Sequence, residues 1–344
     1  MWCDRIVTSP TTIDLRSDTV TTPDERMRVA MAGAVVGDDV LDHDPTMRDL
    51  EEAVAVLLGV EAALWVPSGS MGNLIALMIS LRRGDRFLAA TGSHVLVNEL
   101  GTASWLAGGA PSELAWDVSP GQFSVESLRA AIGSAQPYHG LRTTLLSLEN
   151  THNASGGTVT TPERHAELVA AAREAGLTVH LDGARIWNAS VALGLPPSAL
   201  TVGADTVQVC LSKGLGAPVG SLVAGSSAFV QEARRVRKML GGGVRQGGIL
   251  AAAGLIALNQ IDSLAVDHQN ARLLAEGLTA LGWEVTPPQT NIVIATVPDA
   301  TETLAQLQRV GVLAVPMSGR VRFVTHRDVS ADEIKEVLAR LDEE

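Results

Sequence analysis

Short apolar runs alternate with longer helical periods along the first two thirds of the chain. Helix-like stretches lie between the runs, such as residues 162–175, with Thr161 in place for an N-cap and Gly176 just past the end. The apolar runs are typical of buried strands, and they cover residues 62–67, 86–90, 144–148, 178–181, 206–211 and 221–224. Strands that alternate with helices predict an α/β fold in which a mostly parallel sheet is covered on both faces.

The pattern changes after about residue 250. The elements predicted there are one long helical stretch at 248–281, strands at 291–296 and 321–324, and helices at 302–309 and 331–341. We therefore expect a large domain over residues 1–250, which includes an N-terminal arm at 1–22, and a small α+β domain over residues 251–344.

Composition narrows the partners and the compartment. Of the 344 residues, 46% are hydrophobic and 19% are charged, which is typical of a folded globular protein. The formal net charge of −12 argues against nucleic acid and anionic membranes as partners. The longest apolar stretch, 248–258, is too short to span a bilayer, and the N-terminus lacks the apolar core of a signal peptide. Cys3 and Cys210 are not expected to pair, which favours a cytoplasmic location.

Candidate chemistry gathers where two of the predicted strands end. Asp182 follows the run at 178–181, and Lys213 follows the run at 206–211. Because the carboxyl ends of neighbouring parallel strands meet at one edge of a sheet, the carboxylate and the amine should lie close together. The pair suits pyridoxal phosphate, since an amine binds the aldehyde of that cofactor covalently and a carboxylate keeps its pyridine nitrogen protonated. Taken singly, Asp182 could be only a helix N-cap, whereas the apolar run before Lys213 argues against a merely solvated lysine.

A turn that could bind phosphate follows the first apolar run. Ser68, Gly69 and Ser70 open a helix there, and backbone N–H groups at a helix start can bind an anion. An ordinary strand-to-helix turn with a serine cap is the more common interpretation of such a turn by itself. The sequence has no His-Glu-x-x-His, no paired cysteines and no Gly-x-Ser-x-Gly, so it predicts neither a metal centre nor a nucleophile elbow.

With these motifs in order, the chain resembles the L-threonine aldolase family, whose members are fold-type-I pyridoxal phosphate enzymes. The matching motifs are Asp-Leu-Arg-Ser-Asp-Thr-Val (14–20), Gly-Asp-Asp (37–39), Pro-Ser-Gly-Ser (67–70), Glu-Asn-Thr-His-Asn (149–153), His-Leu-Asp-Gly-Ala-Arg (180–185), Leu-Ser-Lys-Gly (211–214), Lys-Met-Leu-Gly-Gly-Gly (238–243), Arg-Gln (245–246) and Val-Arg-Phe-Val-Thr-His (321–326). Each alone would be weak, but their shared order over nearly the whole chain is specific. The resemblance implies the fold-type-I transferase fold, with a mostly parallel seven-stranded sheet and a small α+β C-terminal domain.

The resemblance also implies roles for individual residues. Those implied in cofactor binding are Ser68, Gly69, Ser70, His94, Asp182, Arg185, Lys213, Lys238 and Arg245. Those implied in binding the substrate carboxylate are Ser17, Arg185 and Arg322. Those implied in catalysis are Lys213, Asp182, His94, which would lie face-on to the cofactor ring, and His139, which would lie near the substrate hydroxyl. Lys238 and Arg245 would reach the cofactor phosphate of a neighbouring subunit, which implies a homotetramer whose minimal active unit is a dimer.

Plainer interpretations of several of these residues stay open from the sequence. Arg185 could form a salt bridge with Asp182, and Arg322 could pair with another acid of the chain. A lone loop histidine such as His94 or His139 is usually structural or solvated. One solvated helix face could hold Arg234, Arg235, Arg237 and Lys238.

The reaction implied by the resemblance is aldol cleavage of L-threonine or L-allo-threonine to glycine and acetaldehyde. His94 or His139 would accept the proton of the β-hydroxyl. Alternatives on the same scaffold are a β-eliminating lyase and an aldolase for aryl-serines. Alternatives of other classes are a cofactor-binding protein without turnover and a nicotinamide-dependent dehydrogenase, which the absence of an early Gly-x-Gly-x-x-Gly disfavours. Leu41 and Asn98 replace residues that are often aromatic in the family, so we expect loose selectivity for the substrate side chain.

Overall fold

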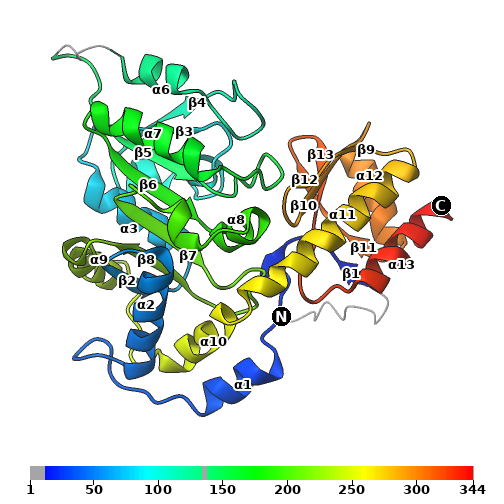
Figure 1. The fold of residues 1–344 in the computed structure, drawn as a ribbon, viewed down its shortest axis with the longest axis horizontal. Helices are drawn as coiled ribbons and strands as arrows, with labels where there is room; N and C mark the ends of the chain where they lie inside the picture. The colour runs from blue at the N-terminus through cyan, green and yellow to red at the C-terminus, as the bar shows by residue number, and fades with distance from the viewer. Residues whose placement is uncertain (1–11, 134–137, 344) are drawn as a thin grey trace, which may run out of the picture.

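The computed structural model describes residues 12–133 and 138–343. A seven-stranded sheet with the order β2-β8-β7-β6-β5-β3-β4 forms the centre of the larger part (Figure 1). Its strands are β2 (Ala62–Val66), β3 (Arg86–Ala90), β4 (Ala110–Leu114), β5 (Thr143–Glu149), β6 (Thr178–Gly183), β7 (Thr206–Cys210) and β8 (Ser221–Gly225). Within this sheet only β8 runs antiparallel to its neighbours, so the expected mostly parallel seven-stranded sheet is confirmed.

The strand that the hydrophobic pattern missed is β4, at the edge of the sheet. It pairs with β3, includes Pro111, and buries only Leu114 among its five residues. Proline cannot donate to a strand ladder and is confined mainly to edge strands. β4 therefore lacks the continuous apolar run that marks the central strands.

Helices cover both faces of this sheet, because successive side chains of each strand point to opposite sides. The helices of the larger part are α1 (Glu25–Ala32), α2 (Pro45–Leu58), α3 (Gly69–Ser80), α4 (His94–Val97), α5 (Thr102–Trp105), α6 (Val125–Ile132), α7 (Pro162–Glu174), α8 (Ile186–Leu193), α9 (Ser227–Met239) and α10 (Gly248–Leu258). In β2, Leu64 belongs to a core cluster with Ile75 of α3 and Val236 of α9, whereas Trp65 belongs to the main core with Leu50 of α2. Short 3-10 helices lie at Asp18–Val20, Pro197–Leu200 and Ile261–Ser263. The expected Thr161 cap of α7 is present, with its side chain accepting the Arg164 N–H.

The prediction of one long helical stretch over 248–281 is wrong. α10 ends at Leu258, and α11 (Leu264–Ala280) continues after the 3-10 turn at a bend of 56°. The Ser263 hydroxyl donates to the Gln260 carbonyl at 2.6 Å, which satisfies a backbone acceptor at the break. Among the described residues no single helix has the length and apolarity to cross a membrane; only the bent pair meets both criteria together, on length and composition alone.

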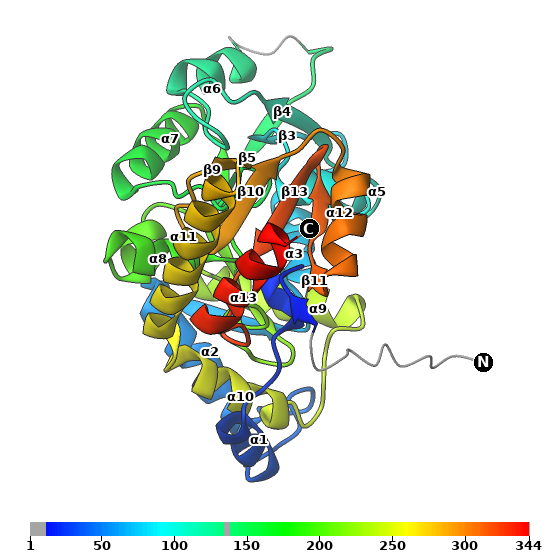
Figure 2. The same ribbon diagram turned by 90° about the vertical axis from the view of Figure 1, so that its right-hand side faces the viewer.

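The C-terminal part is built on a four-stranded antiparallel sheet with its own core. Its elements are β9 (Glu284–Thr286), β10 (Ile292–Thr296), α12 (Ala300–Arg309), β11 (Val312–Leu313), β12 (Val315–Met317), β13 (Arg320–Val324) and α13 (Ala331–Asp342). The sheet order is β12-β13-β10-β9, and its core includes Leu274 of α11, Phe323 of β13 and Ile334 of α13. Figure 2 shows α11, α12 and α13 around this sheet. This is the α+β arrangement expected for the small domain.

The N-terminal arm joins the two parts. β1 (Ile13–Asp14) pairs in parallel with β11, so the arm starts against the C-terminal part. The chain then passes the 3-10 helix Asp18–Val20 and enters the larger part at α1. The domain boundary near residue 250 stays a prediction.

Candidate active site

A pocket opens where β6 and β7 end, and the C-terminal part supplies one of its walls. Two adjoining hollows share Asp182, which ends β6 with Gly183, and Lys213, which follows β7. They also share His94, Thr19 and Ala184, and they therefore form one site. One hollow extends to Ser68, Gly69 and Ser70, and the other extends to Ser17, Arg185 and Arg322. Most of the site residues expected from the sequence thus come together within one chain.

Asp182 is 3% exposed and is held by two donors. Its Oδ2 accepts a hydrogen bond from Asn73 Nδ2 at 2.8 Å, and its Oδ1 accepts one from the Ala184 N–H at 3.0 Å. α8 begins after Arg185 and has no side-chain cap, so Asp182 is not the N-cap of that helix. A buried carboxylate with unused lone pairs can bind a cationic partner from the pocket.

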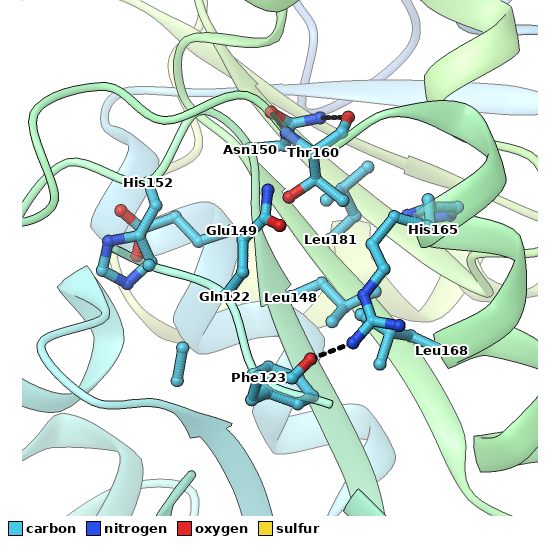
Figure 3. Close-up of a pocket in the computed structure, with 13 residues that line it drawn as sticks. Gln122, Phe123, Leu148, Glu149, Asn150, His152, Thr160, His165, Leu168 and Leu181 are labelled. Carbon is cyan, nitrogen blue, oxygen red and sulfur yellow. Dashed lines mark hydrogen bonds between the residues drawn. The ribbon is translucent and has the colours of Figure 1, made fainter. Parts of the chain in front are cut away.

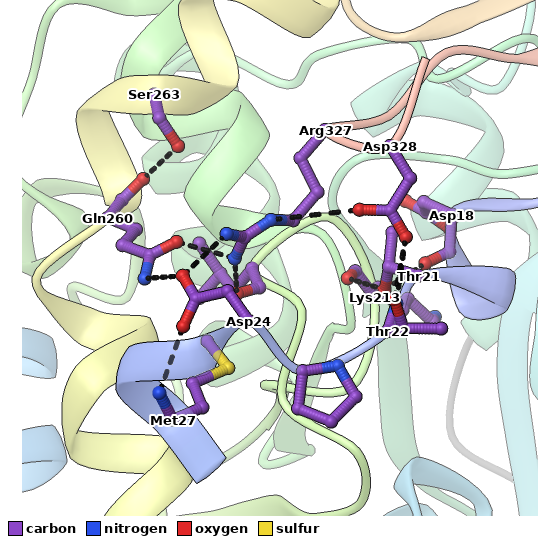
Figure 4. Close-up of polar contacts among 12 residues, drawn as sticks. Asp18, Thr21, Thr22, Asp24, Met27, Lys213, Gln260, Ser263, Arg327 and Asp328 are labelled. Carbon is purple, nitrogen blue, oxygen red and sulfur yellow. Dashed lines mark hydrogen bonds and ion pairs between the residues drawn. The ribbon is translucent and has the colours of Figure 1, made fainter. Parts of the chain in front are cut away.

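The loop that carries Lys213 is fixed by the N-terminal arm and the C-terminal part (Figure 4). The Thr21 hydroxyl donates to the Lys213 carbonyl at 2.8 Å. Arg327 donates to the Leu215 carbonyl at 3.1 Å and pairs with Asp24 at 2.8 Å. Within the described part of the chain, no hydrogen bond to the Lys213 amine itself is present, so the amine is available to the pocket.

The turn that was expected to bind phosphate starts helix α3. Ser68 caps the helix by accepting the Met71 N–H at 3.2 Å. A Cβ on Gly69 would lie 2.9 Å from Cys210 Sγ, so only glycine fits against β7 here. The N–H groups at the start of this 12-residue helix form the end of the hollow. Among the described residues that line this hollow, Lys213 is the only lysine or arginine.

Arg185 and Arg322 lie at the opposite end of the pocket, and both donate to Asn153 Oδ1, at 3.2 and 3.0 Å. The acid that pairs with Arg185 is Asp18 and not Asp182, at 2.6 Å. Arg322 has no acidic partner among the described residues, and it donates instead to the Arg16 carbonyl at 3.2 Å. Burial and the nearby Arg185 charge lower the pKa of Arg322 to about 10. The internal salt bridge considered for Arg322 is therefore absent among the described residues. A buried cation without an acidic partner favours a carboxylate ligand.

His94 lies where the two hollows meet and forms a hydrogen bond with a residue that the sequence did not indicate. Its Nδ1 lies 2.8 Å from Glu99 Oε1, and its backbone N–H donates to Glu149 Oε2 at 2.7 Å. Ligand-type atoms of His94, Glu99 and Asp182 lie within 4.8 Å of one another, a spacing that could suit a metal ion. These atoms already hydrogen bond with one another or with Asn73, so we treat the group as a hydrogen-bond network.

Three expected residues lie outside the pocket. Lys238 is exposed on α9, and Arg245 is 67% exposed, with Asp38 at 3.7 Å. His139 is exposed and contacts the ring of Tyr138. The single solvated face considered for α9 is wrong at Arg237, which is 2% exposed and pairs with Asp39 at 2.6 Å.

A second cavity lies between the sheet and α7 (Figure 3). Leu148 and Leu181 of neighbouring strands line it, together with His165 and Leu168 of α7. No lysine is among its described lining residues. Glu149 lines both this cavity and the active-site pocket and so forms the wall between them.

Four residues of the site were missed from the sequence: Asp18, Asn73, Glu99 and Asn153. Asp18 and Asn153 lie inside motifs that were singled out, but neither had a role there. Asn73 lies on α3, one helical turn beyond Gly69 of the expected phosphate-binding turn. Glu99 follows His94 by five residues, and only the turn after α4 brings it back to the ring.

Comparisons with known proteins agree with this geometry. Residues 14–300 match the beta-eliminating lyase family. Low-specificity L-threonine aldolase 1 of Arabidopsis thaliana is 42% identical over 341 residues, which cover 95% of this chain and 94% of that protein. The low specificity L-threonine aldolase of Escherichia coli is 41% identical over 329 residues, which cover 95% and 97% of the two chains.

The fold has a close match among solved structures. A threonine aldolase of Leishmania major aligns with a TM-score of 0.83 at 20% identity, over 96% of this chain and 98% of that chain. The expected fold class is confirmed by this match. The chain belongs to the beta-eliminating lyase family, and its relatives there include low-specificity L-threonine aldolases.

Proposed function

We propose that this protein is a pyridoxal phosphate-dependent carbon–carbon lyase that cleaves L-threonine and L-allo-threonine to glycine and acetaldehyde. One observation carries the proposal: the Lys213 amine, the buried Asp182 carboxylate and the Arg322 guanidinium without an acid partner line the same hollow. The threonine aldolase names of the relatives support this substrate class.

The residues fit three of the polar groups of pyridoxal phosphate: its aldehyde, its ring nitrogen and its phosphate. Lys213 offers an amine to the aldehyde, and Asp182 has lone pairs left for a protonated ring nitrogen. The phosphate fits the turn at Gly69, where a side chain would collide with Cys210 and Gln208. The buried Gln208 Oε1, which has no described hydrogen-bond partner, lies in the same region.

When bound, this cofactor supplies an aldehyde that joins the substrate amine and a ring that takes up the electrons of the bond broken at Cα. Asp182 holds the proton on the ring nitrogen by its negative charge. Arg185, Arg322 and Ser17 bind the substrate carboxylate, and this clamp fixes the orientation of the Cα–Cβ bond. A base takes the β-hydroxyl proton as that bond breaks, acetaldehyde leaves, and Cα gains a proton to give glycine.

We propose that His94 is the base that accepts the proton of the substrate β-hydroxyl. His94 lines both hollows, and its Nδ1 is engaged by Glu99, so its Nε2 is the nitrogen available to a substrate. His139 is exposed in its own chain and does not line the pocket, so a role for it requires a neighbouring subunit.

The phosphate end of the pocket supports an oligomer. In the described part of its lining, only Lys213 is a lysine or arginine, and that amine is committed to the aldehyde. Lys238 and Arg245 are exposed, and Arg245 has only a 3.7 Å contact with Asp38, so both are placed to reach a neighbouring site. We therefore propose a homotetramer whose minimal active unit is a dimer. We also propose a cytoplasmic location, because Cys210 is buried and free, while Cys3 lies outside the described residues.

The test is an assay of acetaldehyde release, coupled to NADH oxidation by alcohol dehydrogenase, with all four stereoisomers of threonine. We expect both L-isomers to be cleaved, with kcat/KM values within about a thousandfold, or roughly 4 kcal/mol. Both D-isomers should be inert, because the carboxylate clamp fixes the handedness at Cα. Cleavage of D-threonine would contradict the clamp, and no acetaldehyde from any isomer would contradict the proposed reaction.

A further inference from the structure

Glu99 is a buried carboxylate held against the imidazole of His94. α4 ends at Val97 with Asn98 as its C-cap, and Glu99 follows directly. The single turn of α4 separates the two residues, and Glu99 Oε1 lies 2.8 Å from His94 Nδ1. The Glu99 side chain is 1% exposed, whereas the His94 side chain is 34% exposed. The ring thus has one nitrogen on a buried acid and the other toward the open pocket.

A single amide joins Glu99 to the neighbouring Asp182 carboxylate. Asn73 Nδ2 lies 2.8 Å from Glu99 Oε1 and 2.8 Å from Asp182 Oδ2. An amide nitrogen carries two hydrogens, so it can donate one to each acid. Asn73 lies on α3, the helix that starts at the phosphate turn. The same helix therefore positions the anion-binding turn and the amide that bridges the two acids.

The oxygen of this amide lies against a buried histidine. His180 Nε2 lies 3.0 Å from Asn73 Oδ1, and His180 Nδ1 lies 2.8 Å from Thr206 Oγ1. Burial lowers the pKa of His180 to about 4, so the ring is neutral and carries one proton. A carboxylate only accepts hydrogen bonds, so Asn73 turns its nitrogen to Glu99 and Asp182 and its oxygen to His180; because an amide oxygen only accepts, the His180 proton is on Nε2.

We propose that Glu99 is the positioning residue of His94: it holds the imidazole by Nδ1–H, leaves Nε2 facing the pocket as the proton acceptor, and makes that nitrogen a stronger base. The identity of the proton that Nε2 accepts rests on the proposed function. The positioning itself rests on the hydrogen bonds among His94, Glu99 and Asn73.

The groups around His94 raise its pKa on balance, as the proposed role of Glu99 requires. Burial lowers the pKa of His94, but the hydrogen bond to Glu99 and the charges of Asp182 and Glu99 outweigh this, so the pKa is raised despite the opposing Lys213 charge. Glu149 binds the backbone N–H of His94, and Arg185 and Arg322 line the other end of the hollow. Glu99 is the only one of these groups that hydrogen bonds to the ring.

The test follows the protonation of His94 directly. Diethyl pyrocarbonate modifies only the neutral imidazole, so the pH dependence of His94 modification in the holoenzyme, followed by peptide mass spectrometry, gives its pKa. We expect a wild-type midpoint above the ordinary imidazole value of about 6.5, and a midpoint lower by at least about one pH unit in Glu99→Gln. The Gln side chain keeps an oxygen for Asn73 and His94 but lacks the charge. The acid limb of kcat/KM should move to lower pH by the same amount.

Two variants serve as controls. Glu113→Gln makes the same change on the exposed part of β4 and should leave the midpoint unchanged. Glu99→Asp keeps the charge on a shorter side chain and should give an intermediate midpoint, and it carries the test if Glu99→Gln does not fold. An unchanged midpoint in folded Glu99→Gln or Glu99→Asp would overturn the proposal. A wild type that releases no acetaldehyde, together with a lowered midpoint in Glu99→Gln, would overturn the proposed function and leave the positioning intact.

Discussion

Asp18 holds Arg185 at two points, with Oδ2 2.8 Å from Nε and Oδ1 2.6 Å from Nη2. Both side chains are buried, at 0% and 6% exposure. This pairing occupies one edge of the guanidinium and leaves Nη1, which donates to Asn153 Oδ1. Arg185 is therefore aimed by a permanent acid partner, whereas Arg322 is aimed only by an amide and a backbone carbonyl.

Replacement of Arg185 should consequently destabilise the fold more than replacement of Arg322, although both arginines are proposed to bind the substrate. Arg185→Gln leaves Asp18 as an unpaired buried charge and should lower the free energy of unfolding by about 3–5 kcal/mol. Arg322→Gln removes a cation without an acid partner and should change it by less than about 1 kcal/mol. Removal of a charge-assisted hydrogen bond should raise the KM of Arg322→Gln about tenfold to a hundredfold. Urea denaturation and steady-state kinetics measure both effects; equal destabilisation by the two changes would contradict the difference in pairing.

Lys213→Ala should fold but lose the covalent bond to the cofactor. We expect the visible absorbance of the lysine-linked cofactor and nearly all turnover to disappear, because no other lysine lines the pocket. Lys335→Ala is the matched control, since Lys335 is 65% exposed on α13 and pairs with Asp332. A Lys213→Ala protein that still held a borohydride-reducible bond to the cofactor would refute the assignment.

Mixing two impaired variants can test whether each active site contains residues of two subunits. Lys213→Ala and Arg245→Ala should each have low activity, the first through the amine and the second through weak phosphate binding. If Arg245 acts in a neighbouring site, a mixed dimer contains one intact site and one doubly damaged site. Random remixing of the subunits should then restore about a quarter of wild-type activity. Activity no higher than the average of the two parents would show that Arg245 acts within its own chain or not at all.

Asp267 on α11 should make stability depend on pH. It is 2% exposed, its Oδ2 has no described hydrogen-bond partner, and burial together with the Asp18 charge raises its pKa to about 8. The folded state then keeps a proton that the unfolded state releases above about pH 4, so the free energy of unfolding should fall by up to about 1.4 kcal/mol per pH unit between about pH 4 and pH 8. Asp267→Asn should flatten this part of the urea-midpoint profile, and the exposed Asp262→Asn should not. Parallel profiles for wild type and Asp267→Asn would contradict the raised pKa.

The sheet was predictable because its central strands are apolar runs that end in distinctive polar motifs. The run at 178–181 and Asp182 lie where the pattern placed them, and so do the run at 206–211 and Lys213. Prediction failed where local pattern carries little information. β4 is a mostly exposed edge strand with a proline, and the two-residue pairing of β1 with β11 joins segments about 300 residues apart.

The sequence predicted the charged residues that line the pocket but not the residues that hold them in place. Lys213, Asp182 and Arg322 were identified because charged groups are rare on or just after apolar strands, whereas Arg185 was identified from the family resemblance. Asn73 and Glu99 were missed because their roles arise from a fold-dependent contact, and neither residue type at that spacing is unusual. Arg237 was misplaced because a buried ion pair with Asp39 overrides the polar pattern of α9.

The most direct test of the proposed reaction is the product balance of the purified holoenzyme with uniformly carbon-13-labelled L-threonine. We expect NMR to show one glycine and one acetaldehyde for each threonine consumed, since the proposed clamp at Arg185 and Arg322 and the proposed base His94 line one hollow and would together break the Cα–Cβ bond. Formation of 2-oxobutanoate and ammonia in place of glycine would instead show loss of the β-hydroxyl, and it would contradict the assignment as a carbon–carbon lyase.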